Sequence, residues 1–305
     1  MARVLLIGQT GQVGQELQKT LSPIGELIGF GREELDLTKP ESIRQAIRST
    51  QPHLIVNAAA YTAVDKAETE VDLAYAVNQD APAVMAELAQ QMRIPLIHIS
   101  TDYVFDGNQS TPYLETDKPN PMGVYGKSKL AGEARIQEIH ASSPTFPYVI
   151  LRTAWVYGAY GKGNFVKTML RLGAERQEVR VVADQIGTPT WAAAIAEAIG
   201  AVSTQMLLPE AADSLSLSGI YHFTNSGAAS WYDFAVAIFE EAAAMGIPLK
   251  LERVVPITTP EYPTPVKRPP YSVLDCQKIS KFLPAPPQQW RQGLRQMLTQ
   301  YVAHS

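Results

Sequence analysis

Two residues with complementary acid–base chemistry, Tyr125 and Lys129, stand four positions apart in the segment Tyr-Gly-Lys-Ser-Lys. In a helix this spacing places both side chains on one face. A phenol can donate a proton, and a neighbouring ammonium group stabilises the phenolate and lowers the phenol pKa from about 10. The pair predicts a tyrosine general acid tuned by a lysine, although the same spacing also occurs on ordinary surface helices.

Two hydroxyl side chains, Ser100 and Thr101, lie upstream at the end of an apolar segment that begins at residue 96. The segment is typical of a buried β-strand, so both hydroxyls are expected at the carboxyl end of a strand. A hydroxyl near a substrate carbonyl completes the set of groups that a tyrosine- and lysine-dependent reductase needs. The order of these motifs along the chain therefore favours carbonyl reduction over a surface helix.

A glycine-rich turn follows the first apolar segment of the chain and reads Gly8-Gln9-Thr10-Gly11-Gln12-Val13-Gly14. Glycines at these positions allow a tight turn, a close approach of a pyrophosphate to backbone N–H groups, and close packing of a helix on the sheet. A glycine triplet alone also fits a plain strand-to-helix turn. Its position between a strand and a helix at the amino end indicates a dinucleotide site.

The second apolar segment ends at Phe30-Gly31-Arg32, with a cation where NAD-specific sites usually offer a carboxylate. Arg32 therefore favours NADPH, and the alternative is that Arg32 is a solvated loop charge and that NADH is accepted as well. Asp36 and Leu37 fall where an adenine-contacting pair is expected, and small residues end the third strand. The predicted cofactor contacts are Gly8, Gln9, Thr10, Gly11, Gln12, Val13, Gly14, Arg32, Asp36, Leu37, Ala58, Ala59, Ala60, Tyr125 and Lys129.

Up to about residue 155, short apolar segments alternate with longer amphipathic ones. Strands are expected at residues 4–7, 27–30, 54–57, 96–100 and 148–151, and helices at 12–21, 41–50, 69–92 and 126–140. This alternation predicts an α/β fold, namely a Rossmann-type doubly wound parallel sheet with helices on both faces.

The pattern changes after residue 155. Helices are expected at residues 164–176, 191–202, 231–245 and 288–302, strands at 179–183 and 219–224, and a polar loop at 209–218. Six prolines within residues 256–270 predict an extended loop there. We therefore expect a dinucleotide-binding domain at 1–155, to which some later segments return, and a smaller lobe at 156–305 that mainly binds substrate.

The chain resembles the extended short-chain dehydrogenase/reductases and, more narrowly, the dTDP-4-dehydrorhamnose reductases. The resemblance runs nearly end to end, over blocks at 8–14, 57–68, 100–107, 125–129, 151–158, 184–190 and 268–275. One block is specific, because sugar-nucleotide epimerases and dehydratases typically read Asp-Glu-Val-Tyr-Gly where this chain reads Asp-Tyr-Val-Phe-Asp-Gly from residue 102.

The resemblance implies NADPH-dependent reduction of the C4 keto group of dTDP-4-dehydro-6-deoxy-L-mannose to dTDP-L-rhamnose, within nucleotide-sugar and cell-surface polysaccharide biosynthesis. Tyr125 would protonate the new O4, and Thr101 would hydrogen-bond that oxygen. Lys129 would hold the nicotinamide ribose and lower the pKa of Tyr125.

The same resemblance implies a substrate site that contains Asp102, Tyr103, Phe105, Trp155 and Arg268. Trp155 would present a flat face to the sugar, or else anchor the core between the lobes. Arg268 would bind the diphosphate through its guanidinium fork, or else pair with nearby acids as a loop cation.

Some members of this family are dimers joined through magnesium, with one acid in the first helix and others at the start of the helix after the Gly-x-Pro-Thr block. Glu16 matches the first position, but Ala192, Ala193 and Ala194 carry no oxygen ligand at the second. We therefore predict no metal site, and a monomer or a weak homodimer.

The composition narrows the class of protein further. A net charge of -4 argues against nucleic acid as a partner. The apolar run before Gly8 is too short for a signal peptide or a membrane span. The single cysteine, Cys276, favours a reducing compartment. A cytoplasmic protein is therefore expected. His53 and His98 lie in strand-like runs and are interpreted as packing residues.

Two other functions share these motifs. The chain could be a non-catalytic NADP-binding regulatory subunit like the β subunit of methionine adenosyltransferase, which resembles the same family. It could also be an NAD-dependent sugar-nucleotide epimerase, although Arg32 and the block from Asp102 oppose that reading. The chain start, close to the first strand, favours a free-standing enzyme.

Overall fold

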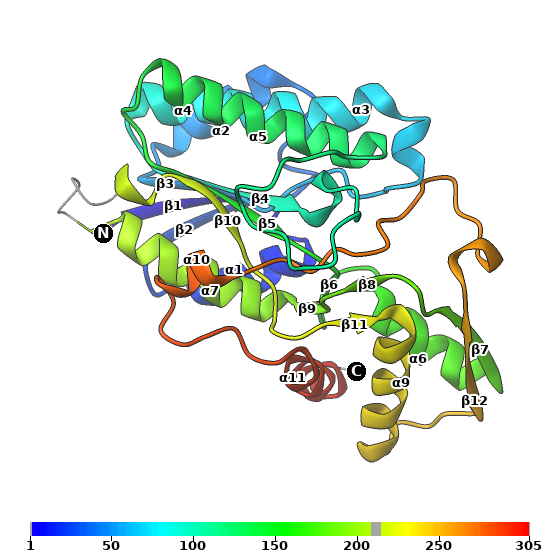
Figure 1. The fold of residues 1–305 in the computed structure, drawn as a ribbon. Helices are drawn as coiled ribbons and strands as arrows, with labels where there is room; N and C mark the ends of the chain where they lie inside the picture. The colour runs from blue at the N-terminus through cyan, green and yellow to red at the C-terminus, as the bar shows by residue number, and fades with distance from the viewer. Residues whose placement is uncertain (1, 209–214, 305) are drawn as a thin grey trace.

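A six-stranded parallel sheet forms the centre of the computed structural model, which describes residues 2–208 and 215–304 (Figure 1). The strands lie in the order β10-β5-β4-β3-β1-β2. Their bounds are β1 Ala2–Ile7, β2 Gly25–Phe30, β3 Leu54–Asn57, β4 Leu96–Thr101, β5 Tyr148–Thr153 and β10 Gly219–His222. The predicted doubly wound α/β fold is confirmed.

Helices cover both faces of this sheet, because the side chains of each buried strand alternate between two hydrophobic clusters. In β1, Val4 and Leu6 pack with helices α1 (Gln12–Leu21) and α7 (Ala192–Met206). Leu5 and Ile7 point the other way and pack with α2 (Pro40–Thr50), α4 (Ala81–Met92) and α5 (Val124–Ser142). Figure 1 shows the two helical layers on either side of the strands.

The helix expected at residues 69–92 is divided in the structure. A 3-10 turn at Lys66–Glu68 precedes α3 (Val71–Tyr75), a π-helical turn at Ala76–Asp80 follows, and α4 begins at Ala81. Buried Asn78 lies in the π-helical turn, where its Nδ2 donates to the Tyr61 carbonyl oxygen and to the Ser128 hydroxyl. The π-helical turn thus places Asn78 for polar contacts, which the pattern of apolar residues does not predict.

A second cluster of helices lies below the sheet in Figure 1. It contains α6 (Phe165–Glu175), α9 (Trp231–Ala244) and α11 (Trp290–Ala303), with β7 (Glu178–Val182) paired in parallel to β12 (Arg253–Ile257). A separate hydrophobic core holds this lobe together, with Phe234, Ile238 and Leu294 fully buried. The helix and strand expected at 164–176 and 179–183 are therefore present within one residue at each end.

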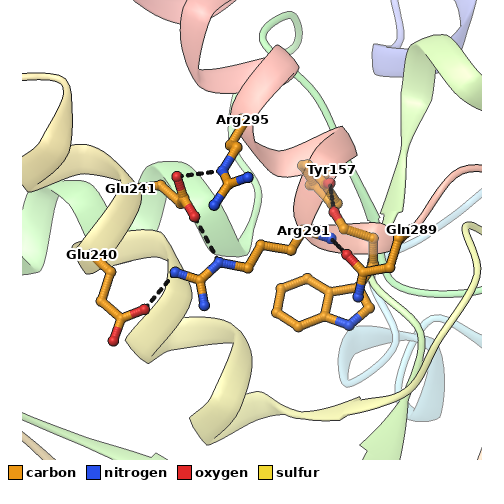
Figure 2. Close-up of polar contacts among 7 residues, drawn as sticks. Tyr157, Glu240, Glu241, Gln289, Arg291 and Arg295 are labelled. Carbon is orange, nitrogen blue, oxygen red and sulfur yellow. Dashed lines mark hydrogen bonds and ion pairs between the residues drawn. The ribbon is translucent and has the colours of Figure 1, made fainter.

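Ion pairs join α9 to α11 in this lobe (Figure 2). The Nε and Nη2 atoms of Arg291 donate to Glu241 and Glu240, each at 2.6 Å, and Nε of Arg295 donates to Glu241 at 2.7 Å. Because the Glu241 side chain is only 8% exposed, its charge depends on these two guanidinium groups. The contacts fix the last helix against the lobe.

Three segments from the second half of the chain belong to the first lobe. Strand β10 pairs with β5 in the central sheet, α10 (Gln277–Ser280) packs on β10, and α7 packs on α1. The sequence patterns predict the strand and α7 but give no sign of α10, which has a single turn of helix.

Several short elements were not expected from sequence. The two-residue strands β6 (Val156–Tyr157), β8 (Ile186–Gly187), β9 (Thr190–Trp191) and β11 (Ala229–Ser230) are too short to show alternation. The proline-rich stretch is not wholly loop, since Pro256 lies in β12 and a 3-10 turn forms at Thr259–Glu261. Of the polar loop expected at 209–218, residues 209–214 lie outside the described residues, and a 3-10 turn covers Leu215–Leu217. Across the two described ranges, no helix has the length and apolar character that spanning a membrane requires.

Candidate active site

The carboxyl ends of β1, β3 and β4 lie side by side at one edge of the sheet, because β3 pairs with both of its neighbours. Doubly wound folds bind ligands at this edge. Three predicted site segments follow these strand ends, namely the turn at 8–14, the alanines at 58–60 and Thr101. Helix α5 starts beside them and carries Tyr125 and Lys129.

The glycine-rich turn is as tight as its sequence predicts. Gly8 has a φ of +90°, and a Cβ atom there would lie 2.7 Å from the backbone nitrogen of Ala59. A Cβ atom on Gly14 would lie 2.0 Å from the carbonyl oxygen of Gly8. Larger residues at either position would push the turn away from β3 and from α1.

The turn leaves room and donors for a dinucleotide. Thr10 and Gly11 are exposed, and no side chain caps the first N–H groups of α1 after Gly11. The side chain of Gln12 accepts a hydrogen bond from Asn164, and Val13 packs against the core. An open, uncapped helix start fits the diphosphate of the predicted cofactor.

Arg32 follows β2 and is exposed, but a carboxylate lies in the same loop. The N–H of Gly31 and Nε2 of Gln9 both donate to Oε2 of Glu34. Sequence reasoning gave Glu34 no role because it follows Arg32 by two positions. The part of the site that is expected to bind the adenosine ribose therefore contains both Arg32 and Glu34, rather than Arg32 alone.

The remaining cofactor candidates divide into exposed and buried ones. Asp36 accepts hydrogen bonds from Thr38 and pairs with Lys39, and these contacts lower its pKa to about 2. Leu37 packs at the margin of the core. The alanines follow β3, where the N–H of Ala58 donates to the carbonyl oxygen of Ile7. Small side chains keep the segment at 58–60 close to the glycine-rich turn.

Gly126 sets how closely α5 approaches the strand-end loop. A Cβ atom on Gly126 would lie 2.2 Å from the carbonyl oxygen of Tyr103. The resulting contact brings Tyr125 against the loop, where its hydroxyl lies beside that of Thr101. The rings of Tyr103 and Tyr125 meet edge to face, with centroids 5.4 Å apart. The structure thus brings Thr101, Tyr103 and Tyr125 together.

The pKa of Tyr125 and the surroundings of Lys129 differ from what the sequence predicts. Burial raises the pKa of Tyr125 above its ordinary value, and the nearby Thr101 hydroxyl opposes the rise without cancelling it. The amine of buried Lys129 lies 3.1 Å from Nε2 of His98 and donates to the carbonyl oxygen of Ile99 at 2.6 Å. Lys129 is not among the groups that shift the pKa of Tyr125 in this arrangement, where burial dominates, so the lowering of that pKa by Lys129 stays a prediction.

Asp102 lies next to Thr101, whose hydroxyl donates to its Oδ1 at 3.1 Å. The residue is 2% exposed. Burial raises the pKa of Asp102 to about 6, against hydrogen bonds from Ser272 and Thr101 that lower it. A carboxyl group with such a pKa changes charge close to neutral pH.

Arg268 reaches the same loop from the far side. Its Nη2 donates to Oδ2 of Asp65 at 2.8 Å, and its Nη1 donates to the Tyr103 hydroxyl oxygen at 3.4 Å. The guanidinium carbon lies 5.8 Å from the centre of the Tyr103 ring. Arg268 is therefore beside the site and paired with an acid, the arrangement of a loop cation, and its binding of a diphosphate stays a prediction.

Trp155 follows β5 with a φ of 46°, which is uncommon for a bulky residue. Its ring stacks on that of Trp231 at the start of α9, with centroids 3.5 Å apart and an angle of 6°. A Cβ atom on Gly187 would lie 2.4 Å from the Trp155 ring. One face of Trp155 is thus held by the second lobe, and this fits the alternative of an anchor between the lobes.

Phe105 has a different environment from the other substrate candidates. It is 1% exposed and stacks on Tyr113, with ring centroids 4.1 Å apart. His222 meets it edge to face, and the Arg152 guanidinium lies 5.2 Å from its ring centre. Because all sides of the ring are packed, Phe105 supports the loop and is better explained as a packing residue than as a substrate contact.

His98, interpreted from sequence as a packing residue rather than a ligand, is buried, but its contacts are polar rather than apolar. His98 is buried among polar partners, with Nδ1 at 3.0 Å from Nδ2 of Asn57 and Nε2 beside Lys129. The sequence signal for these contacts was a histidine within one apolar strand and an asparagine at the end of another.

The acids considered for a metal have other partners in the structure. Glu16 is buried and accepts hydrogen bonds from Lys19 at 2.9 Å and from Gln300 at 2.8 Å. Burial and the charge of Glu16 raise the pKa of Glu197 on α7. An acid therefore lies near Glu16, one turn beyond the alanines at 192–194. The absence of a metal stays a prediction.

The comparisons with known proteins agree over the whole chain. The family model described as RmlD substrate binding domain matches residues 2–303. The dTDP-4-dehydrorhamnose reductase of Escherichia coli strain K12 is 43% identical over 302 residues, which cover 97% of each chain. The protein of the same description from Aggregatibacter actinomycetemcomitans is 44% identical, over 97% of this chain and 98% of its own.

Solved structures give the same picture. The dTDP-4-dehydrorhamnose reductase of Bacillus anthracis, determined in complex with NADP, has a TM-score of 0.85 and 38% identity, with 98% of this chain and 99% of that chain covered. The UDP-glucose 4-epimerase of Thermus thermophilus has a TM-score of 0.78 at 21% identity, over 99% of this chain and all of its own, and shares the fold alone.

Proposed function

Since the chain belongs to the dTDP-4-dehydrorhamnose reductase family, we propose that it reduces the C4 keto group of dTDP-4-dehydro-6-deoxy-L-mannose with NADPH to give dTDP-L-rhamnose. The observation that carries this proposal is the meeting of Thr101 and Tyr125 beside an open dinucleotide turn. A hydroxyl and a phenol at this edge suit an oxygen that gains negative charge as the carbonyl is reduced.

NADPH supplies a hydride when bound, and the chain supplies the proton. Burial keeps the Tyr125 phenol protonated at neutral pH, which is the form that a general acid requires. Tyr125 transfers its proton to O4 of the sugar, and Thr101 hydrogen-bonds the same oxygen. Lys129 binds the nicotinamide ribose hydroxyls, and as an ammonium it stabilises the phenolate that Tyr125 becomes.

The cofactor contacts fall into two groups. The turn at 8–14 and the alanines at 58–60 hold the diphosphate and the adjoining ribose, and their small side chains permit the close approach. Arg32 binds the 2′-phosphate of NADPH, with Glu34 placed to accept a hydrogen bond from a ribose hydroxyl. The combination favours NADPH while leaving NADH as a weaker alternative.

The substrate contacts come from three loops. Asp102 and Tyr103 lie at the sugar, Arg268 binds the diphosphate after it leaves Asp65, and the exposed part of Trp155 faces the ring of the sugar. We place the division between a cofactor-binding domain and a mainly substrate-binding lobe after residue 155. We also propose a cytoplasmic monomer or weak homodimer, since the single Cys276 fits a reducing compartment.

The test is the loss of NADPH absorbance when the protein meets a panel of dTDP-, UDP- and GDP-linked 4-keto sugars. We expect turnover with the dTDP-linked 4-keto-6-deoxy sugar and NADPH, and slower turnover with NADH. A protein that binds NADPH but reduces no member of the panel would instead be a regulatory subunit. Exchange at C4 without net NADPH loss would indicate an epimerase.

A further inference from the structure

A chain of buried polar side chains runs under the Tyr125–Lys129 pair. Asn57 and His98 are register partners on β3 and β4, so their side chains share one face of the sheet. The distance from Nδ2 of Asn57 to Nδ1 of His98 is 3.0 Å, and that from Nε2 of His98 to Nζ of Lys129 is 3.1 Å. Asn57, His98 and Lys129 are at most 1% exposed.

A backbone amide fixes the direction of the first contact. The N–H of Ala59 can only donate, and it donates to Oδ1 of Asn57 at 3.1 Å. The amide group of Asn57 therefore faces His98 with its NH2 group. Since Nδ2 donates, Nδ1 of His98 accepts, and a neutral imidazole in this position carries its proton on Nε2.

The contact between His98 and Lys129 then decides the protonation state of Lys129. Nε2–H of His98 points at Nζ, so Nζ has to accept, and an ammonium group has no lone pair with which to accept. A neutral amine accepts from His98 and donates one of its own hydrogens to the carbonyl oxygen of Ile99 at 2.6 Å. An imidazolium would not resolve the conflict, because its Nδ1–H would meet the donating amide of Asn57.

The titratable groups around Lys129 agree with a neutral Lys129 amine. Tyr125 and Glu133 lie on the same helix as Lys129, His98 faces it from β4, and Arg152 belongs to β5. Arg152 pairs with Glu133 at 2.6 Å, with both side chains 1% exposed, so the nearest carboxylate already has a cation. Burial lowers the pKa of Lys129 to about 8 and Glu133 raises it less, and a hydrogen bond donated by Nε2–H of His98 to the neutral amine lowers the pKa further. Burial holds the pKa of His98 well below its ordinary value, so the imidazole is neutral.

We propose that Asn57 and His98 are positioning residues that hold Lys129 as a neutral amine. Lys129 then has to take up one proton, and turn away from Nε2–H of His98, before it can act as the ammonium partner of Tyr125. The need for the ammonium rests on the proposed reduction. The hydrogen-bond direction and the neutral amine do not, so the two can fail separately.

The direct test reads protonation states by NMR on the free protein. In uniformly ¹⁵N-labelled protein, long-range ¹H–¹⁵N correlations should show His98 with the proton on Nε2 at neutral pH. The ¹³Cε signal of Lys129 should titrate with a midpoint below neutral pH, far below those of exposed lysines. A proton on Nδ1 of His98 at neutral pH, or a Lys129 midpoint above neutral pH, would overturn the proposal.

Two variants test the coupling. In Asn57→Asp one carboxylate oxygen still accepts from Ala59 and the other accepts from Nδ1–H of His98. The proton of His98 should move to Nδ1, and the Lys129 midpoint should rise by roughly one pH unit or more. Asn57→Ala removes the donor without adding charge and should raise the midpoint by a smaller amount.

A change of His98 tautomer with no change in the Lys129 midpoint would show that the two residues are uncoupled. A rise in Asn57→Asp with none in Asn57→Ala would assign the effect to charge alone, and either result sinks the inference. If Asn57→Asp does not fold, the free protein and Asn57→Ala still decide. The substrate panel plays no part in these readouts, so they remain valid if the proposed reduction proves wrong.

Discussion

Arg268 and Asp65 form an ion pair that closes one side of the candidate site, with 2.8 Å between Nη2 and Oδ2. Arg268 follows the proline-rich stretch, whereas Asp65 follows β3, so the pair joins two segments far apart in the chain. The Arg268 side chain is 19% exposed and that of Asp65 is 41% exposed. A guanidinium in this position can exchange a carboxylate for phosphate oxygens without moving far.

The first prediction follows from this exchange. Arg268→Ala should raise KM for the dTDP-linked substrate roughly 10- to 100-fold, the effect of losing a hydrogen bond to a charged group. The value of kcat should change much less. Asp65→Asn is the matched control, since it frees Arg268 and should leave KM equal or lower. Steady-state kinetics that show an unchanged KM in Arg268→Ala would exclude Arg268 from the diphosphate site.

The second prediction concerns the proton donor. Tyr125→Phe keeps the ring that packs on Tyr103 and removes the acidic hydroxyl. We expect kcat to fall by roughly 10²–10⁴-fold, the range for a lost general acid. NADPH affinity, measured by fluorescence titration, should stay within a few-fold of the original. Near-normal turnover in this variant would remove Tyr125 from the chemistry.

The third prediction concerns cofactor choice. Arg32→Ala should raise KM for NADPH and leave that for NADH nearly unchanged, because only NADPH carries the 2′-phosphate. Glu34→Gln is the companion variant and should raise KM for NADH more than KM for NADPH. Parallel kinetics with the two cofactors measure both effects. If Arg32→Ala raises KM equally for both, Arg32 does not contact the 2′-phosphate.

The fourth prediction concerns the buried acid Asp102. The folded-state pKa of about 6 exceeds the unfolded value, so the folded protein binds the extra proton between those two values. The contribution of Asp102 to stability is therefore most favourable in acid and is lost as pH rises through about 6. The free energy of unfolding of Asp102→Asn, relative to that of the original protein, should increase by about 2–3 kcal/mol from acid to neutral pH. Urea unfolding across this range tests the trend, and a pH-independent difference would contradict it.

The fifth prediction concerns metal. Glu16 is already paired with Lys19 and Gln300, and Ala192, Ala193 and Ala194 carry no ligand. Activity should therefore survive EDTA, and the solution mass should not depend on Mg²⁺. Glu197 sharpens the test, because it is the acid on α7 near Glu16. Loss of turnover in EDTA with recovery in Mg²⁺, or dissociation of a dimer by EDTA alone, would show that these acids bind a metal.

The sequence predicted the central sheet because its inner strands are largely buried and apolar on both faces. The glycine-rich turn also has steric requirements that few folds share. It also predicted Tyr125 and Thr101, whose roles depend on residue type and on strand-end position. The state of Lys129 could not be predicted, since it depends on Asn57 and His98, which become neighbours only when β3 and β4 pair. Arg268 and Asp65 meet through tertiary packing, and Phe105 is buried by residues distant in the chain.

The position of β10 beside β5 has a consequence for biosynthesis. Strand β10 begins at Gly219, so the sixth position of the central sheet stays open while the residues between β5 and Gly219 leave the ribosome. During that interval β5 presents an unpaired edge, which is the kind of surface that recruits chaperones or other strands. A fragment that stops at residue 155 would keep this open edge permanently and would also lack α7, the partner of α1. The lobe that carries the glycine-rich turn is thus completed only after Gly219 has been synthesised.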